Sequence, residues 1–503
     1  MKLVTSVFCI GILLCQFIKG QENKHIEIIH ANSIEYNKNS GIEAKKLLGE
    51  VEMKHENIIM TCDSAYLYSE KNYVDAFSNI HIRQGDTLNL YGQLLHYDGN
   101  AKIAKMKKNV SLRDKETLLT TEYLDFKIAE NVAYYYNGGK IVNADNTLTS
   151  QIGNYYTREK LFYYRGNVVI INPKYNIYSD TLKYNTVSHI AFFLGPTNIF
   201  SKEDTIYCEN GWYNTQTDIS QFNKNAYLKS NGKLLKGDSL YYERQIGTGR
   251  AFTNIELIDT SRNLILKGNY AEYTEHPEYS MITDSAVMMQ YNNKDTLFLH
   301  ADTLRSILTD TVTKNHIIIA FYKVKLFKTD MSGKCDSMSY TTADSSIRLY
   351  GHPVLWSGVN QLTSDSVQLF LENKMLKEAR LYNSAFIISQ EDSSKYDQIQ
   401  GKNMIGFFNN NELYKVAVNG NGQTIYYAKD KDDQIGVNKA ESSDLVIYRK
   451  NGKIDRILLL KKPAAILYPL NKVSKEELIL KGFKWYKLSR PLSEKDIFEW
   501  TNE

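Results

Sequence analysis

The stretch LKGDSLYY, residues 235–242, recurs in modified form along nearly the whole chain. Asp238 marks this copy, and we call Asp238 and its equivalents the anchors. The anchors are Asn32, Asp63, Gln93, Glu122, Gln151, Asp180, Glu209, Asp238, Asn269, Asp302, Asp336, Asp365 and Lys402. Five successive steps between Gln93 and Asp238 are 29 residues long, and the other steps are 29 to 37 residues. The spacing predicts a repeat protein of about thirteen copies of about 29 residues.

Apolar side chains flank each anchor on both sides. An apolar residue stands three positions before the anchor, a small residue one before, an apolar residue two after and mostly an aromatic residue four after. Under strict alternation, the first two positions would share one face of a strand and the last two the opposite face. Because all four resemble core positions, the alternation must shift by one residue near the anchor. A β-bulge produces such a shift and bends the strand.

A second strand follows in each copy, after a polar turn such as residues 98–100. It contains an Asn followed by an apolar residue, as in Asn79-Ile80 and Asn254-Ile255. Each repeat therefore reads as two long, bent antiparallel strands without a helix. The 37 Tyr and only 7 Pro also favour strands, because aromatic side chains fit a half-buried pleated surface. The expected fold class is all-β, elongated and antiparallel.

The N-terminus has the pattern of a secretory signal peptide. Lys2 supplies the positive charge, residues 3–18 are mostly apolar, and the small Gly20 precedes a polar stretch. The apolar part is shorter than the roughly 20 residues that a spanning helix requires. We expect residues 1–20 to be the signal peptide and residues 21–439 the repeat array. An uncleaved N-terminal anchor is the alternative.

Three cysteines follow the expected signal peptide, and each occupies the small position before an anchor. They are Cys62, Cys208 and Cys335. Five repeats of two strands separate the first two by about 48 Å in a linear stack, because neighbouring strands are about 4.8 Å apart. A disulfide requires Cα atoms within about 7 Å. We expect all three thiols to be unpaired packing residues.

Charge and motifs argue against several function classes. The net charge is +4 with acidic and basic residues interspersed, so nucleic acid is not expected as a partner. The metal, nucleotide and hydrolase motifs of enzymes are missing, and no enzymatic activity, cofactor or metal is expected. The anchors do not suit calcium, because Gln, Asn and Lys replace Asp at several of them. A side chain that bonds the backbone at a bulge is the simpler interpretation.

The repeat resembles the OstA (organic solvent tolerance) family, which includes lipopolysaccharide transport proteins A and C and the periplasmic domain of protein D. The resemblance rests on the strand GNVVI (residues 166–170) followed by SDTL (residues 179–182), repeated in register. It also rests on the C-terminal stretches LKGFKW (residues 480–485), Arg490-Pro491 and DIF (residues 496–498). It extends over about residues 26–500. Members form a twisted β-jellyroll, open along one side, whose apolar interior holds acyl chains.

The resemblance implies a periplasmic bridge that carries lipopolysaccharide, or a similar glycolipid, toward the outer membrane. Its partners would be that lipid and other lipopolysaccharide transport proteins of the inner and outer membranes. Association with the outer membrane is a further expectation. Two facing sheets of alternating strands can supply an apolar trough for acyl chains. The candidate trough residues are Leu95, Tyr97, Leu124, Phe126, Leu182, Tyr184, Leu235, Leu240, Tyr242 and Leu266. Each could equally fill the core between the sheets.

Two alternatives stay open from the sequence. A surface-exposed structural or adhesive β-repeat protein would share the repeat but would need no open apolar trough.

The segment from residue 440 to 503 breaks the repeat, contains Pro463, Pro469 and Pro491, and is expected to be separate. It would either cap the last sheet edge, as exposed edges require, or dock a partner at the outer membrane.

Overall fold

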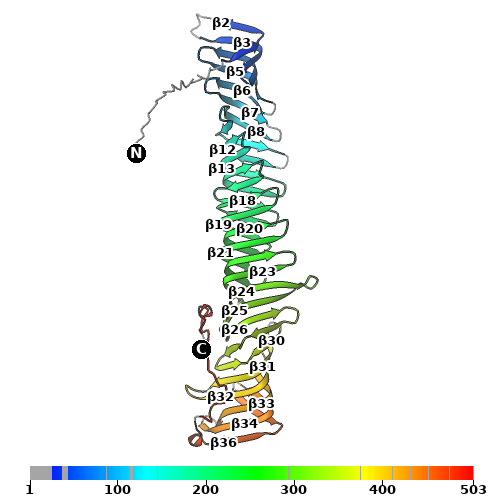
Figure 1. Cartoon of the computed structure of the whole chain (residues 1–503), viewed down its shortest axis with the longest axis vertical. Coiled ribbons are helices and arrows are strands. Elements are labelled where there is room, and N and C mark those ends of the chain that lie inside the picture. The colour runs from blue at the N-terminus through cyan, green and yellow to red at the C-terminus, as the bar shows by residue number, and fades with distance from the viewer. Residues whose placement is uncertain are drawn as a thin grey trace, which may run out of the picture. The chain divides into compact units, whose positions relative to one another are not determined.

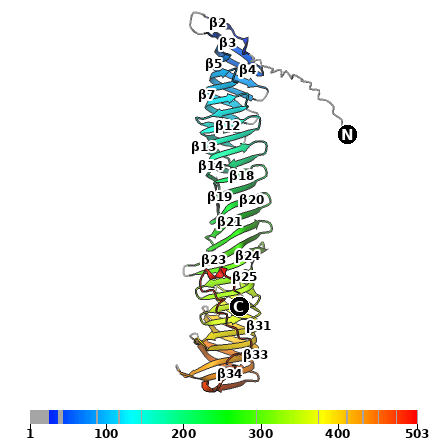
Figure 2. The same cartoon turned by 60° about the vertical axis from the view of Figure 1, so that its left-hand side comes forward.

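The computed structural model describes residues 25–36, 43–85, 88–113, 117–143, 146–292, 295–373, 375–409, 412–430, 433–450, 453–474 and 476–501. The predicted signal peptide, residues 1–20, lies outside the described residues. The chain divides into two compact units, Met1–Pro173 and Lys174–Glu503. Within each unit, antiparallel strands lie one above another (Figures 1 and 2).

The described residues of unit 1 are nearly all in strands and turns. Its strands are β1 (Glu27–His30), β2 (Ser33–Tyr36), β3 (Lys45–His55), β4 (Ile58–Tyr68), β5 (Tyr73–Gln84), β6 (Leu88–Asp98), β7 (Ile103–Arg113), β8 (Leu118–Lys127), β9 (Val132–Tyr135), β10 (Gly139–Val142), β11 (Thr147–Ser150), β12 (Ile152–Tyr156) and β13 (Leu161–Ile171).

Unit 2 continues the same pattern and adds two short 3₁₀ helices near its end. Its elements are β14 (Tyr175–Asn185), β15 (Ile190–Phe193), β16 (Thr197–Ser201), β17 (Asp204–Cys208), β18 (Asn210–Asn214), β19 (Ile219–Ser230), β20 (Lys233–Glu243), β21 (Thr248–Asp259), β22 (Leu264–Thr274), β23 (Tyr279–Tyr291), β24 (Thr296–Asp310), β25 (Asn315–Lys328), β26 (Met331–Thr341), β27 (Ser346–Tyr350), β28 (Val354–Ser357), β29 (Asn360–Thr363), β30 (Ser366–Glu372), β31 (Met375–Gln390), β32 (Tyr396–Asn409), β33 (Glu412–Asp430), β34 (Asp433–Lys450), β35 (Lys453–Leu460), β36 (Ala464–Tyr468), η2 (Leu470–Lys472) and η3 (Asp496–Phe498).

The strands bend at the anchors, which confirms the predicted shift in alternation. On β5 the register passes from Phe77 directly to Ile80, so two residues lie opposite the single anchor Gln93 of β6. Those two residues, Ser78 and Asn79, have φ values of 62° and 50°. Asn is among the few residues that adopt this left-handed conformation readily. A bulge of two residues against one turns each strand through a corner.

The same corner recurs in unit 2, where anchor side chains help to hold it. Thr253 and Asn254 on β21 have φ values of 57° and 54°. The Asn254 side-chain amide donates to Asp238 Oδ2 at 2.8 Å, and its backbone N–H donates to Asn269 Oδ1 at 3.3 Å. The anchors thus bond the polar groups that a bulge leaves without ladder partners, as the sequence suggested.

Some corners interrupt the strand altogether. Pro196 lies between β15 and β16, and Pro353 lies between β27 and β28. Proline has no backbone N–H to donate to the ladder, so it fits a corner and not the strand interior. The expectation of two continuous bent strands is correct for the copies with anchors Asp63, Gln93, Asp238, Asn269, Asp302 and Lys402. In each of the other copies one of the two strands is divided into two half-strands.

Each corner creates two half-sheets whose inner faces oppose one another. The small residue before the anchor sits at the corner, where space is limited. A Cβ added to Gly92, for example, would lie 2.5 Å from Met106 Cγ. Cys62, Cys208 and Cys335 occupy this buried position and are free cysteines, as expected. Burial raises the pKa of each thiol to about 12.

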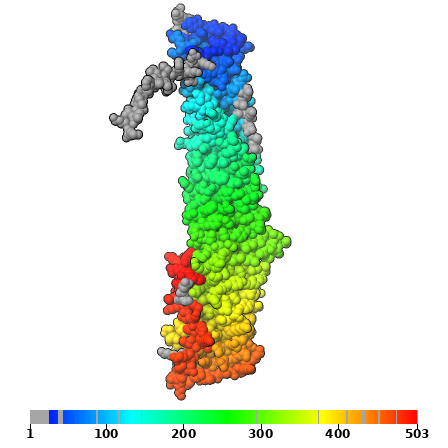
Figure 3. All heavy atoms as spheres, in the orientation of Figure 1, coloured from blue at the N-terminus to red at the C-terminus, as the bar shows by residue number. Residues whose placement is uncertain are grey.

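After β36 the chain turns back along the outer face of unit 2, and we call residues 476–501 the strap (red in Figure 3). Gln361 of β29 donates to the Lys484 carbonyl at 2.7 Å and accepts from the Tyr486 backbone N–H at 2.8 Å. Gln398 of β32 makes the same pair of bonds with strap backbone, at 2.8 and 2.9 Å. The two side-chain amides therefore replace strand partners for the strap.

The strap also buries apolar side chains against this face. Leu480 is 5% exposed and belongs to a cluster with Phe386, Ile388 and Ile425. Further along, Lys325 donates to strap carbonyls, including that of residue 496 at 3.3 Å. The expected boundary at residue 440 lies inside β34, so the sheet runs on to Tyr468. These contacts place the strap on a face of the sheet.

Among the residues that the structure covers, no helix has the length and apolar character needed to cross a membrane.

Candidate functional site

The inner face of unit 2 carries a continuous row of aliphatic side chains, one from each successive strand. We call it the aliphatic row, and its members face one another directly across the strand pairs. From β14 to β25 they are Ile177, Ile199, Ile206, Leu228, Leu235, Leu257, Leu266, Met288, Leu299 and Leu326. The row follows from the apolar residue three positions before each anchor together with its cross-strand partner.

Exposure along this row changes in the middle of unit 2. Ile177 and Leu299 are 3% and 2% exposed, whereas the seven members between them are half-buried. The equivalent row of unit 1 is closed: Met53, Leu90 and Leu112 are 0%, 0% and 3% exposed. Between β16 and β23 the apolar interior is therefore in contact with solvent along its length.

The opposing half-sheet contributes a second row, which we call the tyrosine row. Tyrosines alternate there with small residues, again in direct cross-strand register: Tyr184, Ala191, Tyr213, Ser220, Tyr242, Gly249, Tyr273 and Ser280. Tyr273 is 42% exposed, and the other three tyrosines are half-buried. Tyrosine combines an apolar ring with a polar hydroxyl, so it suits a border between an apolar surface and water.

The hydroxyls of Tyr213, Tyr242 and Tyr273 remain protonated at neutral pH. Burial raises the pKa of Tyr213, and the Asp218 carboxylate, which accepts its hydroxyl at 2.5 Å, raises it further. Burial, followed by nearby Glu275, raises the pKa of Tyr242, and burial also raises that of Tyr273. Protonated hydroxyls can donate hydrogen bonds to the oxygens of a polar headgroup.

Small side chains do not by themselves explain why the interior opens here. Opposite the aliphatic row, β21 and β22 contribute Ala251 and Ala271, which face each other across the strand pair. Unit 1 contains a pair of the same kind, Ala65 and Ala76, and both are 1% exposed. A facing pair of alanines is therefore compatible with a closed core.

The structure separates the ten predicted trough residues into two groups. Six are closed core residues: Leu95, Tyr97, Leu124 and Phe126 in unit 1, and Leu182 and Leu240 in unit 2, with exposures from 0% to 7%. Four are half-buried and lie in the two rows of unit 2: Tyr184, Leu235, Tyr242 and Leu266. Lipid contact at any of the ten stays a prediction.

Sequence reasoning missed the remaining half-buried members of the aliphatic row, notably Ile199, Leu228, Leu257 and Met288. Most of them lie on the second strand of a repeat, where no anchor marks the position. The cross-strand register to Leu235 and Leu266 identifies them.

A polar bond between the half-sheets closes the interior in unit 1. His55 Nδ1 and the Tyr97 hydroxyl lie 2.7 Å apart, and both side chains are buried. Burial is the main cause that raises the pKa of Tyr97. A hydrogen-bonded pair satisfies both polar groups inside an otherwise apolar core.

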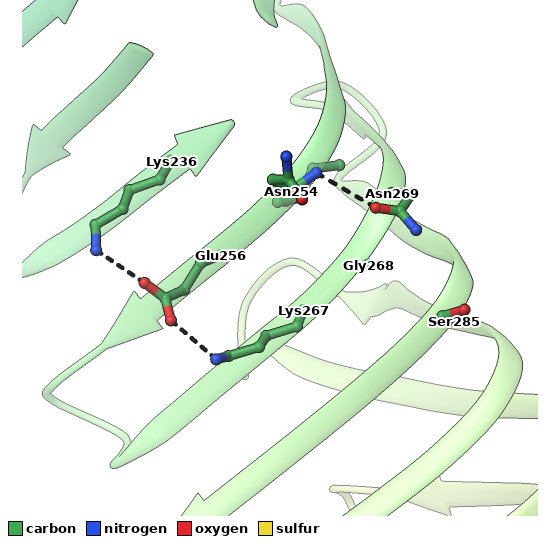
Figure 4. Close-up of a pocket in the computed structure, with 8 residues that line it drawn as sticks. Lys236, Asn254, Glu256, Lys267, Gly268, Asn269 and Ser285 are labelled. Atoms are coloured by element: carbon green, nitrogen blue, oxygen red, sulfur yellow. Dashed lines mark hydrogen bonds and ion pairs between the residues drawn. The ribbon is translucent and has the colours of Figure 1, made fainter. Parts of the chain in front are cut away.

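A shallow pocket lies on the opposite, outer face of unit 2 (Figure 4). Glu256 stands there between Lys236 and Lys267, at 2.8 and 3.2 Å. The hydrogen bond from Lys236 is the main cause that lowers the pKa of Glu256. Glu256 pairs with both lysines, so the three side chains together carry a net charge of +1.

The chain was compared with known proteins. Residues 23–180 and 177–238 match the profile of the family described as OstA-like protein. Residues 23–238 are OstA-like. The match ends at the Asp238 anchor, so the resemblance expected over residues 26–500 is found for this N-terminal part. No curated protein matches the chain.

Among solved structures, the OstA-like chain is similar to LptH of Pseudomonas aeruginosa, titled the LptA-homologous periplasmic component of its lipopolysaccharide transport device. The identity is 13%, over 24% of this chain and 82% of that chain, with a TM-score of 0.21.

Proposed function

We propose that this OstA-like protein carries lipopolysaccharide, or a similar glycolipid, across the periplasm, with the acyl chains against the aliphatic row. The half-buried stretch of that row, from Ile199 to Met288, is the observation that carries the proposal. An amphiphile requires an apolar surface for its tails and an open border for its headgroup. The aliphatic row offers the first, and the tyrosine row offers the second.

The first strands of unit 1 and the last strand of unit 2 support partners of the same architecture. The edge strands of unit 1, β1 and β2, expose Ile29, Ile34 and Tyr36 at 53%, 54% and 60%. In unit 2, β36 exposes Ile466 and Leu467 at 55% and 53%. Edge strands with exposed apolar side chains favour the addition of a strand from another chain. We infer that other lipopolysaccharide transport proteins, of the inner and outer membranes, stack on these edges.

The remaining parts of the proposal follow from this role. Residues 1–20 direct export and are removed, and the mature chain works in the periplasm. It acts as a carrier and not as an enzyme, and it requires no cofactor.

Site-specific photo-crosslinking in living cells tests the lipid site with matched neighbours. A crosslinker at Leu235, which faces inward, should capture lipopolysaccharide or a related glycolipid. The same crosslinker at Leu234 should not, because this half-buried leucine faces outward on the same strand. Tyr242 and Tyr241 form a second pair of the same kind. Equal labelling within each pair, or no labelling at any inward position, would favour a structural or adhesive role.

A further inference from the structure

We propose that the bound glycolipid is confined to one bounded stretch of unit 2, which its acyl chains enter and leave from the side, and that unit 1 holds no lipid. This stretch, which we call the open stretch, is the half-buried part of the aliphatic row from Ile199 to Met288. The inference rests on the proposed function and deepens it, because it states where along the chain the acyl chains lie and how they reach that place.

The open stretch ends toward β14 in buried side chains. Ile177 of the aliphatic row is 3% exposed, and Leu182 of the opposing half-sheet is 1% exposed. Close to Ile177 in sequence, the rings of Tyr175 and Tyr213 meet edge to face, with their centroids 6.4 Å apart. Tyr175 extends from the half-sheet of the aliphatic row and Tyr213 belongs to the tyrosine row. This contact therefore joins the two half-sheets where the open stretch ends.

The aliphatic row closes again at β24 and remains closed beyond it. Leu299 and Leu326 are 2% and 8% exposed. The inward residues that continue the row from β28 to β32 are at most 9% exposed: Leu355, Leu362, Ile387 and Ile399. An acyl chain in the open stretch cannot continue along the row in either direction without displacing close-packed side chains.

The described interior of unit 1 is filled in the same way and also contains bonded polar pairs. His55 Nδ1 lies 2.7 Å from the Tyr97 hydroxyl, and the Tyr135 hydroxyl lies 2.6 Å from Ser150 Oγ. All four side chains are buried. An acyl chain between the half-sheets of unit 1 would separate these pairs and leave buried polar groups without partners, which is unfavourable.

The open stretch is long enough for whole acyl chains. Its seven members lie on successive strands, and at about 4.8 Å between neighbouring strands they span about 29 Å. The hydrocarbon core of a bilayer is about 30 Å thick and contains two layers of acyl chains, so one layer spans about 15 Å. Because both ends of the stretch are closed and its members meet solvent, the tails must pass through its open side, which the tyrosine row borders.

Photo-crosslinking at four equivalent positions tests the proposal. Tyr97 and Tyr155 of unit 1 and Tyr213 and Tyr242 of unit 2 each stand four residues after an anchor. The photoreactive p-azidophenylalanine is close to tyrosine in size and replaces each of them singly, with the melting temperature as the check on folding. The chain is purified from the periplasm of an expression host and illuminated with purified lipopolysaccharide. The two positions of unit 2 should capture at least about tenfold more lipid than those of unit 1, because a binding site buries its ligand against its own lining.

Hydrogen exchange of the unsubstituted chain gives a second readout that does not depend on the folding of variants. Added lipopolysaccharide should slow exchange in β19–β23 and leave β4–β8 unchanged. Capture at Tyr97 or Tyr155 equal to that at Tyr242, or equal slowing in β4–β8, overturns the confinement to unit 2 and leaves the proposed function intact. Capture at none of the four positions, with exchange unchanged throughout, overturns the proposed function and this inference together.

Discussion

Leu234 and Leu235 show that the position of a residue along its strand determines whether the side chain faces the interior or the outer surface. They are neighbours on β20 and both are half-buried, but they lie on opposite faces. Leu235 continues the aliphatic row, whereas Leu234 belongs to the outer surface. Because the faces alternate with every residue, a substitution at one position reports on the interior and the next position serves as its control.

A charge in the aliphatic row should block lipid binding without unfolding the chain. Leu235→Arg places a guanidinium in a half-buried position, from which a long side chain can reach water. We expect retained glycolipid, measured by mass spectrometry of the purified protein, to fall about tenfold, which corresponds to about 1.4 kcal/mol. Leu234→Arg should leave it unchanged. Leu182→Arg should instead lose several kcal/mol of stability, because Leu182 is 1% exposed and the charge would be buried.

The buried thiols should not react with alkylating reagents while the protein is folded. With the pKa of Cys62, Cys208 and Cys335 raised to about 12, almost no reactive thiolate exists at pH 8. Iodoacetamide should label all three only after unfolding in guanidinium, as counted by mass spectrometry. Serine in their place should fold normally, because Gly237 and Ser179 occupy the same position in other repeats. Rapid labelling of the native protein would contradict the burial of these thiols.

At the scale of the secondary-structure element, two features shape the sheet: the corner at each anchor and the strap. A corner is local, since it requires two residues with positive φ opposite one anchor. The strap is non-local, since Gln361 lies 123 residues before the carbonyl to which it donates. Both use side-chain amides to bond backbone groups that have no ladder partner.

Removal of the corner side chain should loosen one repeat. Asn254→Ala loses the bond to Asp238 and places alanine in a left-handed conformation that asparagine adopts more readily, at a combined loss of about 1–3 kcal/mol. Hydrogen exchange should accelerate in β20–β22. Asn254→Gly should be milder, since glycine adopts positive φ freely. Equal effects of Ala and Gly would mean that the backbone conformation contributes little.

Release of the strap should be visible by limited proteolysis. Gln361→Ala removes both bonds to the strap backbone, and Gln398→Ala removes the second pair. Trypsin should then cut faster after Lys484 and Lys487, by roughly tenfold if about 1.4 kcal/mol of local stability is lost. Gln368 of β30, a half-buried glutamine that accepts a hydrogen bond from the Tyr382 hydroxyl, offers the matched control as Gln368→Ala. Unchanged cleavage in both strap variants would show that the apolar contacts of Leu480 suffice.

At the scale of the whole molecule, each strand mainly contacts its neighbours in the stack. Repeat proteins of this kind lose structure locally, because stability is a sum over adjacent repeats. The division into two units adds a further boundary between Pro173 and Lys174. Damage in one unit should therefore leave the other folded.

A cavity in unit 1 tests this independence. Phe126→Ala removes a side chain that is 0% exposed and should destabilise its surroundings by about 3–5 kcal/mol. Hydrogen exchange measured by mass spectrometry should accelerate in β7–β9 and stay unchanged in β30–β34. Lys127→Ala, next to it and exposed, is the control. A uniform loss of protection over both units would show that the stack unfolds as one cooperative body.

The sequence by itself determined the antiparallel fold, the bends at the anchors and the corner position of the three cysteines. These features are repeated and local: an alternating pattern selects the buried face, and a short motif such as Asn254-Ile255 opposite an anchor specifies the bulge. Because the pattern is repeated, it can be recognised even in copies whose own motif is weak.

Only the tertiary structure decided which of the equivalent inward residues form a closed core and which meet solvent. Leu90 and Leu235 both stand three residues before an anchor, but one is 0% exposed and the other is half-buried. The difference depends on how side chains on several strands fill the space between the half-sheets together. The position of the strap was equally inaccessible, because its partners, Gln361 and Gln398, are distant from it in sequence.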